Sequence, residues 1–198
     1  MTPGAILAFW CALGGAVATQ QAAPPPSETQ AVLDQARPGP EHASLEALEG
    51  RWTREVTLSM GGGQQMKARG TATNRMILGG RFLQSDQSTS FPASTVVPAT
   101  TTESMTIYGF DKRTREFTVL ELDSMGTYWV TASGPRTAAP AIVMSGETLE
   151  DHGGRREIQR YDMVLRIVDA DTYVTQIIFK FDRAPALTLL EAVHRRIK

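Results

Sequence analysis

Polar and apolar residues alternate along most of this chain, which has 198 residues. From Met66 to Met76 the even positions are small or apolar except for Asn74, whereas the odd positions carry Lys, Arg or Thr. A period of two predicts a strand with one buried face. Nine further segments have strand character and are separated by turn-forming residues. They are 52–58, 81–86, 103–110, 116–124, 128–134, 141–149, 157–168, 172–181 and 186–197.

About ten consecutive strands without a helix between them predict an all-β protein built as an antiparallel meander. Closure removes the unpaired edges of such a sheet, so a closed antiparallel β-barrel is expected, with a flat sandwich as the alternative. One short helix is predicted over 44–49, where Leu45 and Leu48 share a face. Residues 86–102 are rich in Ser, Thr and Pro and are predicted to form a loop, either disordered or a lid over the barrel mouth.

The first 18 residues contain no Lys, Arg, Asp or Glu, and Ala5 to Val17 is an apolar run. This run is too short to span a bilayer as a helix but suits a secretory signal peptide cleaved after Ala18. We therefore expect a periplasmic or secreted protein without a membrane span in the mature chain. A buried N-terminal helix or a wrongly assigned start codon is the alternative. The only cysteine, Cys11, lies in this segment, so no disulfide is expected after cleavage.

Residues 19–40 are rich in Pro, Gln and Ala, a composition typical of a flexible linker, which leaves 41–198 as a single domain. The formal net charge is −1, so no nucleic-acid partner is predicted, because such partners require a strongly basic surface. The three histidines, His42, His152 and His194, lack metal-ligand spacing, so neither a metal nor a cofactor is expected. His42 and His152 are expected to face solvent.

Three segments carry a resemblance to a known family. They are residues 70–85, which fold about Gly79-Gly80, the tripeptide 40–42 (Pro-Glu-His) and residues 123–127 (Asp-Ser-Met-Gly-Thr). Together they resemble the bacterial family called domain of unknown function 1579, over about residues 39–198. The family has no assigned activity. Its pattern places a Trp two residues before Asp123, where this chain has Glu121.

A second resemblance concerns the start of the first strand. Gly50-Arg51-Trp52 follows the predicted helix and is similar to the Gly-x-Trp signature of lipocalins. In that superfamily the Trp packs beneath an Arg from the last strand and closes the base of the barrel. The resemblance implies a lipocalin-like barrel in which Gly50, Trp52 and Arg196 are structural residues.

Polar residues on otherwise apolar faces mark a candidate ligand site, because a buried polar group without a partner is costly. Arg54 lies between Trp52 and Val56 on one face, and Asn74 interrupts the small residues of the second strand. Glu191 shares a predicted face with Leu187, Leu189 and Val193, and Tyr161 with Met163, Leu165 and Ile167. First and last strands are neighbours in a closed barrel, so Arg54 and Glu191 are predicted to pair, either satisfying each other or orienting a ligand head group.

The expected function is therefore non-catalytic binding of a small, partly apolar or amphipathic molecule inside the barrel. Its polar lining would be Arg54, Asn74, Tyr161 and Glu191. The alternative is a packed structural or protein-interaction module without a ligand. A third interpretation is an enzyme with Arg54 and Glu191 as its acid and base, or a haem protein. The haem would be held by His194, as similarity to nitrobindin-like barrels implies, unless that histidine is a barrel-end side chain.

Overall fold

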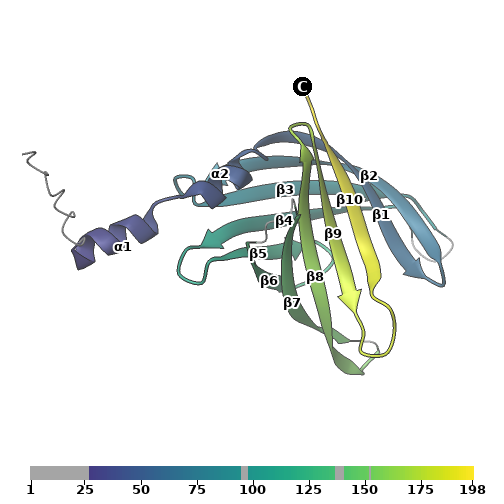
Figure 1. The fold of residues 1–198 in the computed structure, drawn as a ribbon. Coiled ribbons are helices and arrows are strands. Elements are labelled where there is room, and N and C mark those ends of the chain that lie inside the picture. The colour runs from purple at the N-terminus through teal and green to yellow at the C-terminus, as the bar shows by residue number, and fades with distance from the viewer. Residues whose placement is uncertain (1–26, 95–97, 137–140, 152) are drawn as a thin grey trace, which may run out of the picture.

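The computed structural model describes residues 27–94, 98–136, 141–151 and 153–198. It shows ten antiparallel strands that follow one another around a barrel, closed by pairing of the first strand with the last (Figure 1). The prediction of a closed antiparallel β-barrel of about ten strands is confirmed. The predicted signal peptide, residues 1–18, and His152 lie outside the described residues. The strands are β1 (Gly50–Gly61), β2 (Gln64–Ile77), β3 (Phe82–Phe91), β4 (Thr100–Asp111), β5 (Glu116–Asp123), β6 (Trp129–Pro135), β7 (Ala141–Asp151), β8 (Arg156–Asp169), β9 (Thr172–Lys180) and β10 (Leu187–Arg196).

Two helices precede the barrel in the part of the chain that the structure describes. Helix α2 (Pro40–Glu46) begins and ends earlier than the predicted helix, because Pro40 occupies its first turn and the side chain of His42 caps it. The Nδ1 atom of His42 accepts a hydrogen bond from the backbone N–H of Gly39 at 3.0 Å. The expectation that His42 faces solvent is wrong, since only 6% of this residue is exposed.

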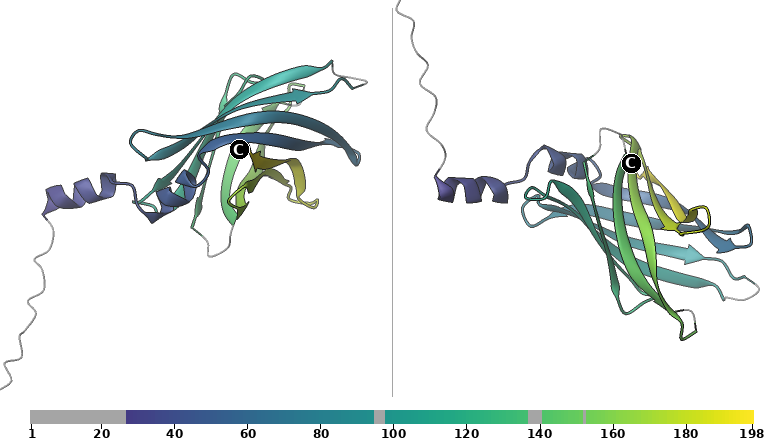
Figure 2. Two further views of the ribbon diagram at one scale, coloured as in Figure 1. Left: turned by 90° about the horizontal axis from the view of Figure 1, so that it is seen from above. Right: turned by 60° about the horizontal axis from the view of Figure 1, so that its bottom comes forward.

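Helix α1 (Glu28–Ala36) lies within the predicted linker and was not expected there. Its residues Glu28 to Ala36 are all left unburied, and it projects away from the barrel in each view (Figures 1 and 2). The helix begins at Ser27, whose side chain accepts a hydrogen bond from the backbone N–H of Gln30. It therefore adds nothing to the core, in keeping with the composition of the segment.

The loop predicted over 86–102 is wrong at both ends. Strand β3 continues to Phe91 and β4 begins at Thr100, with Ser and Thr at many of the additional positions. Threonine is β-branched and suits strands, and the inner face of these strands is polar rather than apolar. A polar stretch here is therefore strand and not loop.

Inner faces follow the predicted alternation on β1 and β2. Trp52, Arg54 and Val56 are buried on β1, whereas Thr53 and Glu55 are exposed. On β2 the small residues face inward, and Gly70 lies so close to β3 that an added Cβ would meet the carbonyl oxygen of Ser88 at 2.0 Å. Small side chains on β2 thus allow neighbouring strands to curl tightly around the interior.

Candidate functional site

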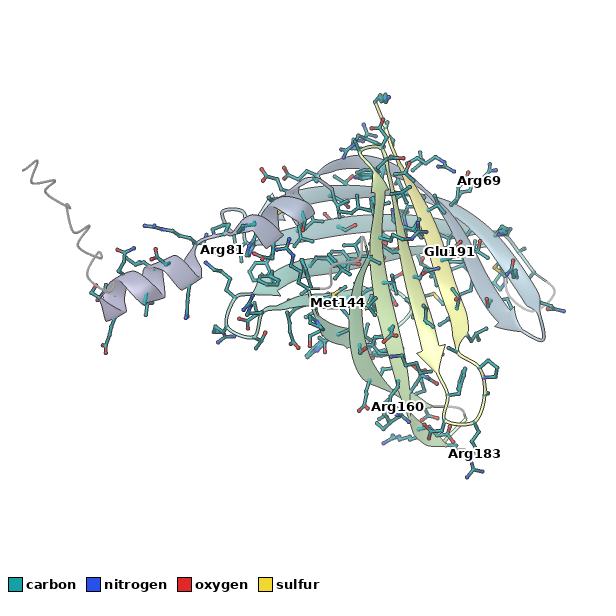
Figure 3. The ribbon with its side chains drawn as sticks, viewed as in Figure 1. Arg69, Arg81, Met144, Arg160, Arg183 and Glu191 are labelled. Carbon is teal, nitrogen blue, oxygen red and sulfur yellow. The ribbon has the colours of Figure 1, made fainter. Side chains whose placement is uncertain are left out.

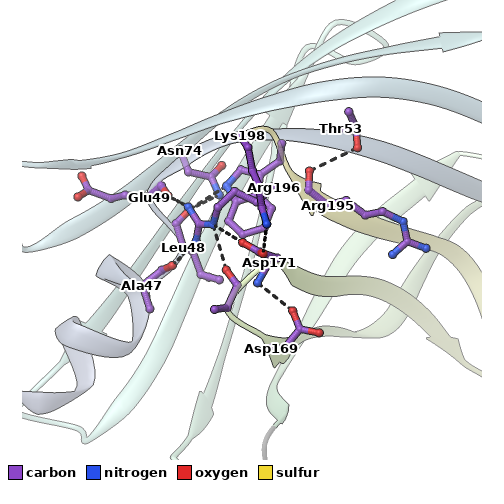
Figure 4. Close-up of polar contacts among 12 residues, drawn as sticks. Ala47, Leu48, Glu49, Thr53, Asn74, Asp169, Asp171, Arg195, Arg196 and Lys198 are labelled. Carbon is purple, nitrogen blue, oxygen red and sulfur yellow. Dashed lines mark hydrogen bonds and ion pairs between the residues drawn. The ribbon is translucent and has the colours of Figure 1, made fainter.

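The end of the barrel next to α2 is closed by Trp52 and Arg196. The Trp52 ring is fully buried, and its Nε1 donates a hydrogen bond to the carbonyl oxygen of Leu48 at 3.0 Å. The guanidinium of Arg196 lies 4.1 Å from the centre of the Trp52 ring, the arrangement implied by the lipocalin resemblance. Its nitrogens donate to the carbonyl oxygens of Ala47, Glu49 and Ala170 (Figure 4).

Two further residues predicted from sequence lie at this closed end. Gly50 has a φ of +123°, and a Cβ at this position would lie 2.8 Å from Nη1 of Arg196. Glycine is therefore needed both for the backbone conformation and for the approach of Arg196. Asn74 donates from Nδ2 to the carbonyl oxygen of Leu48 at 2.9 Å and to the hydroxyl of Tyr173 at 3.1 Å. Asn74 therefore lies at the closed end, where protein oxygen atoms accept both hydrogen bonds of its amide group.

Tyr161 lies inside the barrel at the seam between β6 and β7. Among the described residues, register partners join these strands only at Ala132–Gly146 and Ser133–Ser145. The hydroxyl of Tyr161 crosses Gly146 and donates to the carbonyl oxygen of Thr131 at 2.8 Å. An added Cβ on Gly146 would come within 2.7 Å of that hydroxyl. Tyr161 thus supplies a hydrogen bond where the ladder between β6 and β7 is short.

Replacing Tyr161 by Phe tests this role. The Thr131 carbonyl loses its donor while the buried ring is retained, so we expect the free energy of unfolding to fall by about 1–2 kcal/mol. Chemical denaturation measures it. Tyr128→Phe is the matched control, because Tyr128 is 57% exposed and its substitution is expected to change stability by less than about 0.5 kcal/mol. Equal effects of the two substitutions would contradict the role of Tyr161 at the seam.

The predicted pair of Arg54 with Glu191 is wrong. On the β1–β10 ladder Arg54 is opposite His194, whereas Glu191 is opposite Thr57, which belongs to the outer face of β1. The Glu191 carboxylate accepts a hydrogen bond from Nε2 of Gln176 at 2.7 Å. Glu191 therefore lies on the outer surface of β10 (Figure 3), and an enzyme mechanism using these two residues as acid and base is not supported by the geometry.

A belt of polar side chains crosses the middle of the barrel instead. Arg54 is 7% exposed, and its Nη1 donates to the hydroxyl of Thr89 on β3 at 2.8 Å. Beside Thr89, Gln87 donates to the hydroxyls of Ser85 and Thr106 at 3.1 and 3.0 Å. The inner face of β3 thus bonds to the guanidinium of Arg54 through Thr89 and to Thr106 of β4 through Gln87.

A cavity of about 40 Å³ lies against this belt, and Arg54 and Glu121 both line it. Methionines and aliphatic residues complete the wall: Met144, Met163, Ile177 and Leu190. At about 10–15 Å³ per water molecule, the volume suits about three waters or a small head group. The site therefore combines a cationic group, an acidic group and an apolar wall within the barrel.

Three buried polar atoms have no hydrogen-bond partner within the part of the chain that the structure describes. They are Nε of Arg54, Oδ1 of Asn74 and Nδ1 of His194. An unpaired buried donor costs about 1–3 kcal/mol. Among the described residues Arg54 forms no ion pair within 4.0 Å, so its charge is compensated only at longer range. Arg54 thus retains a charge and a donor for a further partner.

Glu121 is the acidic group that faces this interior. Burial raises the pKa of its carboxyl to about 7, with the nearby charge of Arg54 acting against burial and that of Asp123 adding to it. Burial likewise raises the pKa of Tyr173 to about 12 and lowers the pKa of Arg54. At neutral pH the interior therefore contains a charged guanidinium and a carboxyl group that is half protonated.

His194 lies inside the barrel and is only 1% exposed. Its ring stacks on Tyr173 with centroids 4.0 Å apart, and Nε2 lies 3.2 Å from the hydroxyl of Thr175. Burial and the charge of Arg54 lower the pKa of His194 to about 2, so the imidazole is neutral. The 40 Å³ cavity is far smaller than a porphyrin, so these residues do not fit a haem.

Several site residues were missed by the sequence reasoning, namely Ser85, Gln87, Thr89, Thr106 and Glu121. Alternation over Leu83, Ser85, Gln87 and Thr89 would have placed them on one face with a buried leucine at its end. Glu121 occupies an inner position of β5 opposite Thr106, and the departure from the family pattern at this position was the available signal. Among the described residues, no cluster of three or more His, Cys, Asp and Glu is arranged to hold a metal ion.

Comparisons with known proteins agree with this architecture. A family model described as "Protein of unknown function (DUF1579)" matches residues 37–196. The solved structures that match include Rv2717c from M. tuberculosis, with a TM-score of 0.58 and 15% sequence identity over 82% of this chain and 100% of that one. At this identity the likeness concerns the fold. No match was found among curated proteins. Within the described residues no helix is long and apolar enough to cross a membrane.

Proposed function

The chain belongs to the DUF1579 family of proteins of unknown function, and from its own geometry we propose that it binds a small, partly apolar molecule inside the barrel without catalysing a reaction. Arg54 is the polar anchor of the site, and the ligand's polar group occupies the cavity beside it. Export, which residues 1–18 predict from sequence, belongs to the same proposal and is tested by cell fractionation.

The observation that carries the proposal is the unpaired Nε of Arg54. An arginine that is only 7% exposed normally has its donors satisfied, because burial removes water as a partner. Here Nη1 donates to Thr89, Nε has no acceptor among the described residues, and Arg54 is one of the residues that line the cavity. A ligand oxygen would supply the missing acceptor.

The apolar part of the ligand would contact the methionine side chains that line the cavity. Met144 and Met163 are register partners on β7 and β8, and both are almost completely buried. Methionine side chains adapt to irregular shapes, so this wall accepts a small apolar group without a preformed large pocket. The site therefore favours a compact ligand with one polar end.

A thermal-shift panel tests the function. We expect small amphipathic molecules to raise the melting temperature of the full chain, because a ligand at about 100 times its Kd stabilises the folded state by about 2.7 kcal/mol. Arg54→Met, which retains the volume and removes the charge, should abolish the shift. Thr53→Val, on the outer face of the same strand, should not. A panel of short fatty acids, alcohols, amides and small aromatics that leaves the wild-type melting temperature unchanged would overturn the proposal.

A second candidate function, docking of another protein, is favoured by one observation. The outer face of β4, β5 and β6 carries apolar cross-strand neighbours, among them Met105, Leu122 and Trp129, and Trp129 is 65% exposed. Sedimentation of the full chain tests it: self-association that Trp129→Ser abolishes would support docking of a second copy. A monomer at every concentration would argue against self-docking through this face.

A further inference from the structure

Arg54 and Glu121 line the same cavity, and this pair of groups indicates the chemical class of the ligand. The two residues come from β1 and β5 and line the same 40 Å³ space, yet no ion pair within 4.0 Å joins them among the described residues. A group placed between them would contact a donor on one side and a carboxyl on the other. The cavity is of the order of size of a single carboxylate group.

We propose that the ligand is a short monocarboxylic acid whose carboxylate binds Nε of Arg54, and that its binding is coupled to protonation of Glu121. This inference rests on the proposed function. With Glu121 protonated, the ligand carboxylate accepts hydrogen bonds from both the guanidinium and the carboxyl O–H. With Glu121 ionised, the same ligand would leave two like charges against one cation in a buried space.

Charge balance favours a monocarboxylate over a phosphate. One buried guanidinium compensates one negative charge, and the second charge of a dianion would remain buried without a partner. Burial raises the pKa of Glu121 to about 7, so its carboxyl gains and loses a proton within the ordinary pH range. An additional anion in the cavity would raise that pKa further, so binding takes up a proton.

The other titratable groups around Glu121 do not change their protonation state near pH 7, or act on Glu121 only through their charge. Asp123 on the same strand raises the pKa of Glu121. Tyr108 and Tyr161 have pKa values that are raised by burial, so both hydroxyls stay protonated at ordinary pH. Tyr173 and His194, which face Arg54, are likewise neutral there. Among the described residues that line this cavity, Glu121 is therefore the one that exchanges a proton near pH 7.

Isothermal titration calorimetry of the full chain with hexanoate tests the inference, and hexanamide is the matched neutral ligand. With a pKa of about 7, Glu121 is about 90% protonated at pH 6 and about 10% at pH 8. We therefore expect hexanoate to bind about tenfold more tightly at pH 6 than at pH 8. Buffers of different ionisation enthalpy should show uptake of about one proton at pH 8 and almost none at pH 6. Hexanamide should bind more weakly and without pH dependence.

Two variants sharpen the test. Glu121→Gln should bind hexanoate equally well at both pH values, since the amide mimics the protonated carboxyl. Glu191→Gln, on the outer face, should keep the wild-type pH dependence. Equal, pH-independent binding of hexanoate and hexanamide would overturn the carboxylate inference and leave the binding function standing. Absence of binding by both overturns the inference as well, and the thermal-shift panel then shows whether the function itself fails.

Discussion

Replacing Trp52 by Ala is expected to lower the free energy of unfolding by about 4 kcal/mol, the largest effect of a single substitution in this barrel. The Trp52 ring is fully buried, meets Tyr173 edge-on at 4.7 Å and lies beneath Arg196. Its removal leaves a cavity at the closed end, deprives the Leu48 carbonyl of one donor and exposes the interior to water. Urea or guanidinium denaturation followed by circular dichroism measures the change.

Trp129 provides the control for this measurement. It is an indole of the same size on the outer surface of β6 and is 65% exposed. Trp129→Ala, assayed in dilute solution, is expected to change stability by less than about 0.5 kcal/mol. If the two substitutions had equal effects, the closed end would not be the principal support of the barrel.

Glu121→Gln is expected to stabilise the protein at pH 8 and to leave it unchanged at pH 4. The folded-state pKa of Glu121 is about 7, above its ordinary value of 4.5. The folded protein therefore holds more protons than the unfolded chain between these values, and the contribution of Glu121 to stability is lost as pH rises from 4.5 to 7. Because Glu121 is only partly buried as a residue, we expect a gain on the order of 2–3 kcal/mol for Gln at pH 8.

His194 has the opposite dependence. Its folded-state pKa is about 2, below its ordinary value of 6.5, so the unfolded chain binds a proton that the folded protein does not. The contribution of His194 is present above pH 6.5 and is lost as pH falls. Between pH 4.5 and 6.5 the two slopes oppose each other, and wild-type stability should change little from these two groups.

Melting temperatures from pH 4 to 8 separate the two contributions. Glu121→Gln should become clearly less stable on acidification below pH 6.5, because only the effect of His194 remains. His194→Phe, which keeps the stack on Tyr173, should become more stable on acidification from pH 7 to 4.5. Glu191→Gln should follow the wild type. Parallel profiles for wild type and Glu121→Gln would show that Glu121 does not face a low-dielectric interior.

The closed end of the barrel could be predicted from the sequence because the residues that form it lie in short, recognisable segments. Gly50 and Trp52 open the first strand, and an arginine near the end of the chain completes the set. Alternation on β1 and β2 is equally clear, since polar and small or apolar positions separate over many residues. Arg54 was placed inside the barrel for this reason, and the structure has it there.

Strand β10 shows why Glu191 was misplaced. Leu187 pairs with Phe179, but the register shifts between Thr188 and Leu190, and the residues beyond it that face inward are Leu190, Ala192 and His194. One extra residue at a bulge exchanges the two faces of a strand. Apolar residues occur on both faces here, so no alternation reveals the exchange. For this reason the sequence pairs Arg54 with Glu191, which lies on the outer face of β10, instead of with Glu121 on the inner face of β5.

Glu121 was missed for a different reason. The strand that carries Glu121 was predicted. The polar residues of β3 and β4 that lie in 86–102 were predicted as a loop, however, so nothing in the sequence indicated that an inner polar face lies near Glu121. The polar belt depends on which inner positions meet across the barrel, and that is set by the registers of β3, β4 and β5 together. Such long-range pairing has no counterpart in the local pattern of a single segment.

Native mass spectrometry of the full chain, purified from cells without denaturation, tests the binding function most directly. Spectra of wild type and Arg54→Met are compared under native conditions and after unfolding. We expect an adduct of small mass on the wild type that is lost on unfolding and is absent from Arg54→Met. A wild-type spectrum without an adduct, both as purified and after incubation with each compound of the thermal-shift panel, would contradict the binding function.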